Sequence, residues 1–153
     1  ENTIYFQHLS MDGLEEMHAY SKNEKLYEFF EFQPFSTIKE TQVYLDKLLN
    51  RMIAENGERT STYWFVRRST DDRLVGTACL VNLDFDRRSV EMGYAIDPEL
   101  WGNGYILKIQ EALKQYVFQI VPLSMILCIE QVYQARTEVV RYVLFCCFSS
   151  NIR

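Results

Sequence analysis

The chain has 153 residues, of which 48% are hydrophobic, and its formal net charge is -5. This size and apolar content predict a single domain, residues 1–153, with one core. The negative charge argues against a nucleic-acid partner, and no apolar run reaches the roughly 20 residues of a membrane-spanning helix. Because the amino terminus also lacks a signal-peptide pattern, we expect a cytoplasmic protein with no membrane partner.

The first half of the chain predicts one strand followed by helices. A strand is expected over residues 3–9, then one or two short helices within 11–30. A clearer helix spans 36–56, with Ser36 or Thr37 as its cap. The aromatic stretch "FFEFQPF" between these helices is typical of a loop folded over another part of the protein.

The second half predicts strands and then alternating elements. Three strands are expected over 62–68, 73–85 and 87–98, the first two joined at the turn "STDD". A helix over about 104–118, a strand within 123–133 and a last helix within 137–148 follow. This order indicates an α/β (α+β) domain with a largely antiparallel sheet. Neither the two histidines nor the four cysteines have metal-ligand companions at useful spacing, so no metal site is predicted.

Two glycines flank one asparagine where the third strand passes into the next helix. The first turn of a helix presents N–H groups without intrahelical partners and carries partial positive charge. Without Cβ atoms at the glycines, a phosphate can approach these groups closely. The N–H groups in question belong to Gly102, Asn103, Gly104, Tyr105 and Ile106. The pattern is neither GxGxxG nor a Walker loop, and taken alone it is more often a tight turn.

The surrounding residues carry a family resemblance. The order "EMGYAIDPELWGNGY" resembles the acetyl-CoA-binding segment of the Gcn5-related N-acetyltransferases (GNAT), especially the branch that acetylates ribosomal-protein alanine, amino sugars and other small amines. The resemblance is closest over 74–118. In the family pattern Q/R-x-x-G-x-G/A, Trp101 takes the first position and Gly104 the inner glycine, whereas Ile106 departs from the last Gly or Ala.

The resemblance implies a fold and a cofactor, acetyl-CoA. It implies a twisted mixed, mostly antiparallel sheet flanked by helices, whose fourth strand, about 89–96, splays from the fifth, about 123–131, to form the cofactor cleft. The cofactor-binding residues that it implies, besides Trp101 and the glycine turn, are Tyr94, Ala95 and Ile96 through their backbone, and Gln134, which stands where an Asn is usual.

Two catalytic candidates follow from the chemistry of acetyl transfer and from the resemblance. A substrate ammonium must lose a proton before it attacks a thioester, so a nearby carboxylate helps. Glu91, on the strand that resembles the family's fourth, is the candidate base, or else a solvent-facing strand residue. Tyr142, eight residues after Gln134 in the predicted last helix, is the candidate acid for the leaving thiolate, or else a packing residue.

The acceptor is expected to be a primary amine on a small molecule, an amino sugar or a protein N-terminus. The aromatic loop offers Tyr27, Glu28, Glu31 and Phe32 to a cationic amine, although a hydrophobic plug with solvated acids fits the same residues. The resemblance implies two more strands after the last predicted helix, so we expect a chain shortened at its carboxyl terminus, or else an edge covered by a rearranged helix or by a second copy, in a homodimer. A GNAT-like CoA-binding or regulatory module with weak catalysis is the second hypothesis.

Overall fold

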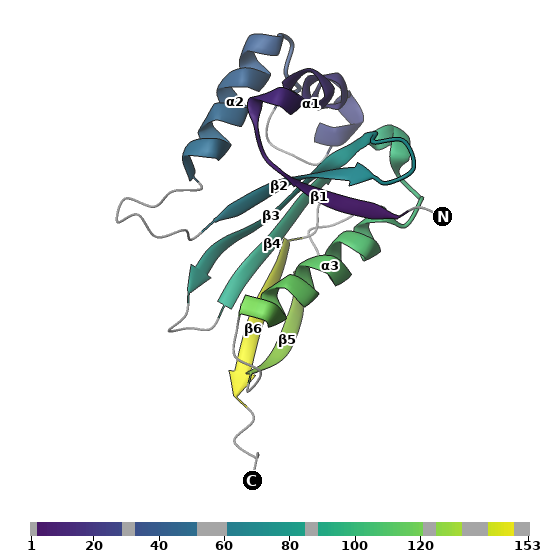
Figure 1. Ribbon diagram of the computed structural model, residues 1–153. Helices are drawn as coiled ribbons and strands as arrows, with labels where there is room; N and C mark the ends of the chain where they lie inside the picture. The colour runs from purple at the N-terminus through teal and green to yellow at the C-terminus, as the bar shows by residue number, and fades with distance from the viewer. Residues whose placement is uncertain are drawn as a thin grey trace.

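The computed structural model describes residues 3–28, 33–51, 61–84, 89–120, 125–132 and 141–148. Figure 1 shows the elements in chain order: β1 (Ile4–His8), η1 (Met11–Gly13), α1 (Leu14–Ser21), η2 (Glu24–Tyr27), α2 (Ile38–Arg51), β2 (Thr62–Arg68), β3 (Leu74–Asp84), β4 (Ser89–Ile96), η3 (Pro98–Leu100), α3 (Tyr105–Ile120), β5 (Met125–Val132) and β6 (Arg141–Phe148). Within the described ranges, no helix has the length and apolar character needed to cross a membrane.

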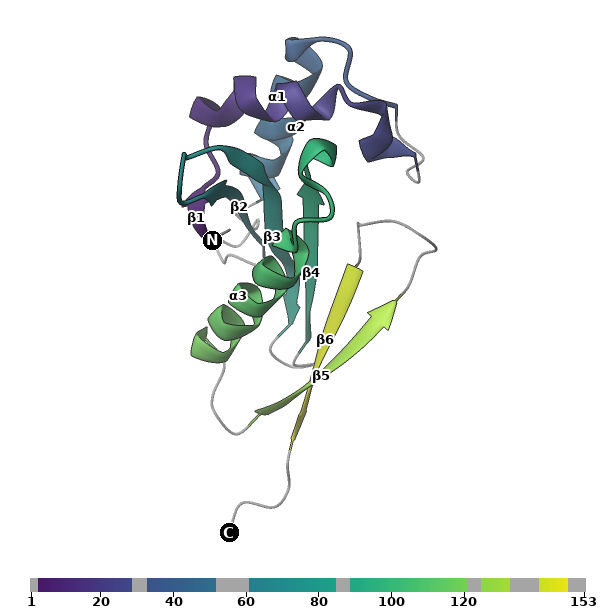
Figure 2. The same cartoon turned by 90° about the vertical axis from the view of Figure 1, so that its right-hand side faces the viewer.

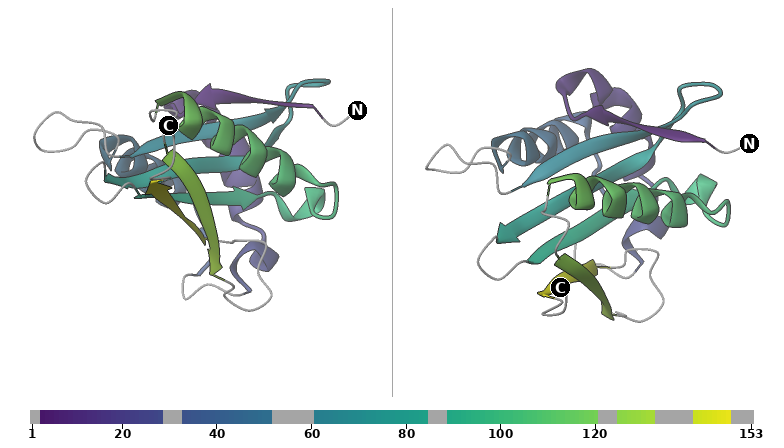
Figure 3. Two further views of the ribbon diagram at one scale, coloured as in Figure 1. Left: turned by 90° about the horizontal axis from the view of Figure 1, so that it is seen from below. Right: turned by 60° about the horizontal axis from the view of Figure 1, so that its bottom comes forward.

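The strands form one sheet in the order β1-β2-β3-β4-β6-β5. Every pairing between described strands is antiparallel, which confirms the predicted mostly antiparallel sheet, without a parallel pair in this part of the chain. Helix α3 lies on one face of the sheet, and α1 and α2 lie on the other (Figures 1 and 3). The expected flanking helices are therefore present on both faces.

The sheet separates two halves of the core, because the side chains of its strands alternate between the two faces. Val90, Met92, Tyr94 and Ile96 are buried under α3, whose own buried residues recur at helical spacing. Those residues are Tyr105, Ile109, Leu113 and Val117. The opposite face packs against α1 and α2 through a second cluster: Leu9, Met17, Tyr20, Leu26, Leu45, Leu48, Tyr63, Phe65 and Leu74.

The amino terminus of α2 confirms the predicted cap and adds its partner. The Thr37 hydroxyl oxygen accepts a hydrogen bond from the Glu40 backbone N–H at 3.3 Å. The Glu40 carboxylate in turn accepts from the backbone N–H groups of Ser36, at 2.6 Å, and Thr37, at 3.0 Å. This reciprocal arrangement is a capping box, so Thr37 rather than Ser36 is the capping residue.

The helix predicted within 137–148 is wrong. Residues 141–148 form β6, which pairs with β5 along its whole length and with β4 over Ser89–Met92. The run "RYVLFCCF" is apolar at nearly every position, so helical periodicity does not separate a buried strand from a helix, while its β-branched and aromatic residues suit a sheet. The fifth strand was expected to lie next to the fourth. That placement is wrong, because β6 lies between β4 and β5, and β5 forms one edge of the sheet. Figure 2 shows β6 and β5 diverging from β4.

Candidate functional site

The glycine turn between η3 and α3 has a backbone that favours glycine. Gly102 has φ of +80° and Gly104 has φ of +77°, in the left-handed region that residues with a Cβ rarely adopt. A Cβ built on either glycine would have no heavy atom within 4 Å. The segment is therefore a tight turn whose glycines face open space, and its binding of a phosphate stays a prediction.

The amino terminus of α3 opens into that space. The first intrahelical bond runs from the Lys108 N–H to the Gly104 carbonyl at 3.4 Å, so the amides of Tyr105, Ile106 and Leu107 come before the intrahelical ladder. The first turn contains no acidic side chain. A cavity of about 190 Å³ lies here, lined by Ile96 and residues 100–107. Free amides, the positive end of the helix dipole and the lack of a competing carboxylate suit an anionic ligand.

Side chains of the turn are bonded to the turn's own backbone. The Trp101 indole N–H donates to the Ile96 carbonyl at 3.0 Å, and the Asn103 amide donates to the Leu100 carbonyl at 2.9 Å. Tyr105 is buried, and Ile106 packs against the core under α3. Of the residues predicted to bind the cofactor, Ile96 and residues 101–106 line this cavity, and the side chains of Trp101 and Asn103 hold the backbone of the turn.

Beside this turn, β4 has an edge that β6 does not cover. Pairing with β6 ends at Met92, and within the described residues Gly93–Ile96 pair only with β3. The N–H of Asp97 donates to the Val75 carbonyl on β3 at 2.9 Å, so the carbonyl of Ile96 faces the other way. Because peptide groups alternate along a strand, the N–H and carbonyl of Tyr94 and the N–H of Ile96 also point away from β3.

Ala95 differs from its neighbours on this strand. Its backbone groups face β3, by the same alternation. The Tyr94 and Ile96 backbones are therefore better placed than that of Ala95 to meet a ligand, and all three cofactor contacts stay predictions. The tyrosine ring lies under α3, where its hydroxyl accepts a hydrogen bond from the Gln110 amide at 3.2 Å.

Glu91 and Tyr142 come from adjoining strands. Glu91 is half-buried on the face opposite Met92, as the alternation predicted, and pairs in register with Val81 of β3 and Val143 of β6. Tyr142 pairs with Met92, one position further along β4. Because directly opposed residues of paired strands share a face of the sheet, this register assigns Tyr142 to the face of Met92 and not to that of Glu91, and Tyr142 lies on a strand and not on the predicted helix. Their roles stay predictions.

Comparison with known proteins identifies the family. Residues 4–146 match the family model described as the acetyltransferase (GNAT) domain. The chain belongs to the GNAT family. A curated relative, the spermidine N(1)-acetyltransferase of Vibrio cholerae, is 26% identical over 118 residues, which cover 77% of this GNAT chain and 64% of the relative's length.

Solved GNAT structures share the fold. The spermidine N-acetyltransferase from Vibrio cholerae, in complex with CoA and spermine, superposes with a TM-score of 0.65 at 15% identity, over 95% of this chain and 96% of that one. A GCN5-related N-acetyltransferase from Brucella melitensis gives a TM-score of 0.66 at 16% identity, over 98% and 80% of the two chains. The predicted alanine and amino-sugar branch stays a prediction.

The predicted acceptor residues of this GNAT chain are partly described. Tyr27, at the end of η2, is half-buried, and its ring lies 6.2 Å from that of Phe35 at an interplanar angle of 67°. Burial raises the pKa of the Tyr27 hydroxyl. Glu28 is exposed. Glu31, Phe32 and Gln134 lie outside the described residues, so their predicted contacts stay predictions.

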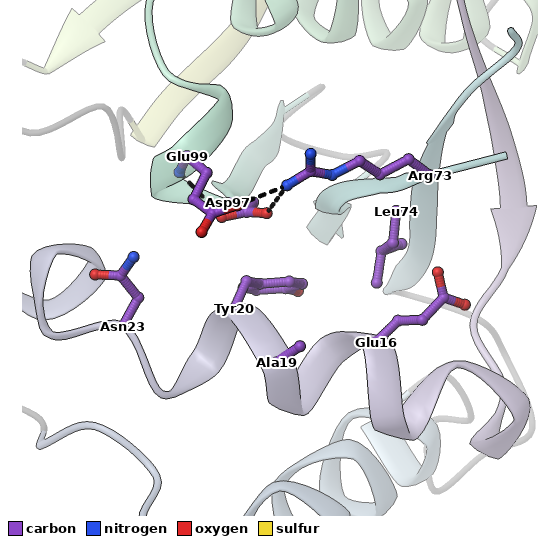
Figure 4. A pocket seen from close by; sticks show the side chains of 8 residues that line it. All are labelled: Glu16, Ala19, Tyr20, Asn23, Arg73, Leu74, Asp97 and Glu99. Atoms are coloured by element: carbon purple, nitrogen blue, oxygen red, sulfur yellow. Dashed lines mark hydrogen bonds and ion pairs between the residues drawn. The ribbon is translucent and has the colours of Figure 1, made fainter. Parts of the chain in front are cut away.

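A second cavity, of about 250 Å³, lies between α1 and the ends of β3 and β4 (Figure 4). Its lining residues are Glu16, Ala19, Tyr20, Asn23, Arg73, Leu74, Asp97 and Glu99. One nitrogen of the Arg73 guanidinium contacts the carboxylates of Asp97 at 3.1 Å and Glu99 at 2.9 Å. The described residues contain no group of three or more side chains suited to a metal ion.

Sequence reasoning missed the contact between Arg73 and Asp97. The two residues are 24 positions apart, at the start of β3 and just after β4. The order Asp-Pro at the end of a predicted strand was a usable signal, because Asp is a common helix cap and Pro is common at the first helical position. Nothing local pointed to the arginine.

Proposed function

We propose that this chain is an acetyl-CoA-dependent N-acetyltransferase that transfers an acetyl group to a primary amine. The observation that carries the proposal is the position of the α3 amino terminus directly beside the open edge of β4. Membership of the GNAT family supports it, as does the CoA in the solved structure of the Vibrio cholerae spermidine N-acetyltransferase.

The residues of the site fit acetyl-CoA. The N–H groups of Gly104, Tyr105 and Ile106 would hold the pyrophosphate, since they lie at the positive end of a helix and next to a glycine whose missing Cβ leaves open space. The Tyr94 backbone groups and the Ile96 N–H, which point away from β3, would pair with the amides of the pantetheine arm. When bound, acetyl-CoA supplies the acetyl thioester.

Glu91 would take the proton from the acceptor. A primary ammonium with a pKa of about 10 is almost entirely protonated at neutral pH, and only its neutral form has the lone pair that forms the new C–N bond. A half-buried carboxylate near the end of the open edge is in a suitable place to accept that proton, directly or through water. The departing thiolate would receive a proton from Tyr142 or from solvent.

For the acceptor, we propose a small-molecule amine carrying more than one positive charge. The curated relative is named for spermidine, the solved relative holds spermine, and the formal net charge of -5 favours a cationic substrate. The aromatic and acidic residues Tyr27, Glu28, Glu31 and Phe32 would line its approach. A protein N-terminus as acceptor and a homodimeric assembly stay as secondary proposals.

Two measurements test the proposed function. Calorimetry with CoA tests the cofactor site, and release of the CoA thiol from acetyl-CoA is followed with spermidine, spermine, glucosamine and a peptide with a free amino-terminal alanine. We expect CoA binding and the fastest turnover with the polyamines. Binding without turnover on any amine would support the weakly catalytic module instead, and the absence of CoA binding would overturn both hypotheses.

A further inference from the structure

Two side chains fasten the glycine turn to the end of β4. The first is Trp101, whose indole N–H donates to the carbonyl of Ile96 at 3.0 Å. That carbonyl faces the open side of β4, because the following N–H, of Asp97, is bonded to β3. The indole therefore occupies the Ile96 carbonyl, the last acceptor of the open edge. Because Trp101 directly precedes Gly102, this hydrogen bond joins the end of β4 to the glycine turn.

The second is Asp97, which links three segments of the chain. It is only 8% exposed. One of its carboxylate oxygens accepts from the Glu99 backbone N–H at 3.0 Å and so caps η3, while the other accepts from the Arg73 guanidinium at 3.1 Å. Figure 4 shows the arginine reaching across from the start of β3 to both acids. The position of η3, and of the turn that follows it, thus depends on this carboxylate.

We propose that Trp101 and Asp97 are positioning residues that set the separation between the α3 amino terminus and the open edge of β4. This inference rests on the proposed function, in which one CoA molecule engages both. A ligand that must satisfy two fixed groups binds tightly only when their spacing is already correct, since any rearrangement lowers the observed affinity. Neither side chain needs to touch the ligand.

The ion pairs of Arg73 provide a matched pair of variants. The same guanidinium nitrogen contacts Asp97 and Glu99 at similar distances, but the Asp97 side chain is 11% exposed and that of Glu99 is 71% exposed. An exposed pair contributes little, whereas a charge-assisted hydrogen bond to a buried carboxylate contributes more. Asp97→Asn keeps an oxygen to cap η3 and loses the ionic contact, and Glu99→Gln is its control. Trp101→Phe removes the indole N–H and keeps an aromatic ring.

The experiment measures CoA affinity, steady-state kinetics and hydrogen exchange in the ligand-free protein. We expect affinity to fall roughly three- to tenfold in Trp101→Phe, as loss of one hydrogen bond of typical net strength produces. Asp97→Asn should lose about tenfold or more, and Glu99→Gln should stay within about twofold of the parent. The KM for acetyl-CoA should rise, while kcat and the KM for the amine stay unchanged. A purely structural role would instead lower kcat, because less of the protein would be folded and active, and would leave the KM for acetyl-CoA unchanged.

Hydrogen exchange separates this inference from the proposed function. The hydrogen-bonded amides of Leu100, Trp101 and Lys108, on either side of the turn, should exchange faster in Trp101→Phe and Asp97→Asn than in the parent, while those of β2 keep their protection. If the parent binds no CoA, the proposed function fails, and the exchange comparison still decides whether the two side chains hold the turn. Parental exchange in the turn together with parental CoA affinity in both variants would overturn the positioning roles.

Discussion

Replacing Gly104 with alanine tests the backbone of the turn and the anion site in one variant. With φ at +77°, an L-residue at this position costs about 1–2 kcal/mol, because the left-handed conformation brings its Cβ close to the following carbonyl oxygen. No atom lies within 4 Å of the added Cβ, so no steric clash adds to that cost. For a chain of this size, the melting temperature should fall by about 2–8 °C.

The effect on ligand affinity is a separate quantity. Backbone strain is present with and without ligand and largely cancels in the dissociation constant. The added methyl group, however, projects into the space from which a phosphate would approach the amides of α3. We expect CoA affinity to fall more than tenfold, or by more than about 1.4 kcal/mol. The larger, branched side chain of Gly104→Val should weaken binding further.

Gly102→Ala is the matched control, because Gly102 has φ of +80° and equally open surroundings. Gly102 lies two residues before Gly104, whose carbonyl accepts the first hydrogen bond of α3, and so it is further from the helix amides. Its melting temperature should fall by a similar amount, with a smaller loss of CoA affinity. Thermal unfolding and calorimetry measure the two quantities. A Gly104→Ala protein that is destabilised as expected but binds CoA like the parent would refute the anion-site reasoning.

Three further predictions concern catalysis and pH. If Glu91 is the base, Glu91→Gln should lower kcat by roughly 10²–10⁴ at neutral pH with CoA affinity unchanged, and less at high pH, where more amine is neutral; a parental kcat at pH 7 would remove that role. If Tyr142 is the acid, Tyr142→Phe should slow single-turnover thioester cleavage, and agreement with the parent within about twofold, or about 0.4 kcal/mol, would exclude it. A hydrogen bond from Arg68 lowers the pKa of the Asp71 carboxyl from 3.8 to about 2. The ionised carboxylate therefore stabilises the folded protein above pH 4, and this stabilisation is lost as the pH falls toward 2. Urea unfolding should therefore show a difference between the parent and Asp71→Asn at pH 6 that disappears near pH 2, and a difference that persists there would contradict this assignment.

Local patterns were enough for much of the fold. The alternation of Val90, Met92, Tyr94 and Ile96 specified a strand with one buried face, and hence the opposite orientation of Glu91, because the side-chain period of a strand is two. The capping residues of α2 bond to one another within four consecutive positions, and the two glycines form the turn through their own φ angles. Each of these features depends on neighbours within a few residues, which the sequence displays directly.

The tertiary structure decided what depends on distant partners. Residues 141–148 are apolar at nearly every position, so periodicity does not choose between helix and strand; pairing with β4 and β5 selects a strand and places Tyr142 beside β4. The contact of Asp97 with Arg73 joins residues 24 positions apart, and β4 keeps an open edge, among the described strands, because β6 pairs with only part of it. The sequence by itself determined the glycine turn and the strand before it. The distance between the turn and the strand edge arises from long-range contacts, because the energies of those contacts depend on burial and on partners that no local pattern contains.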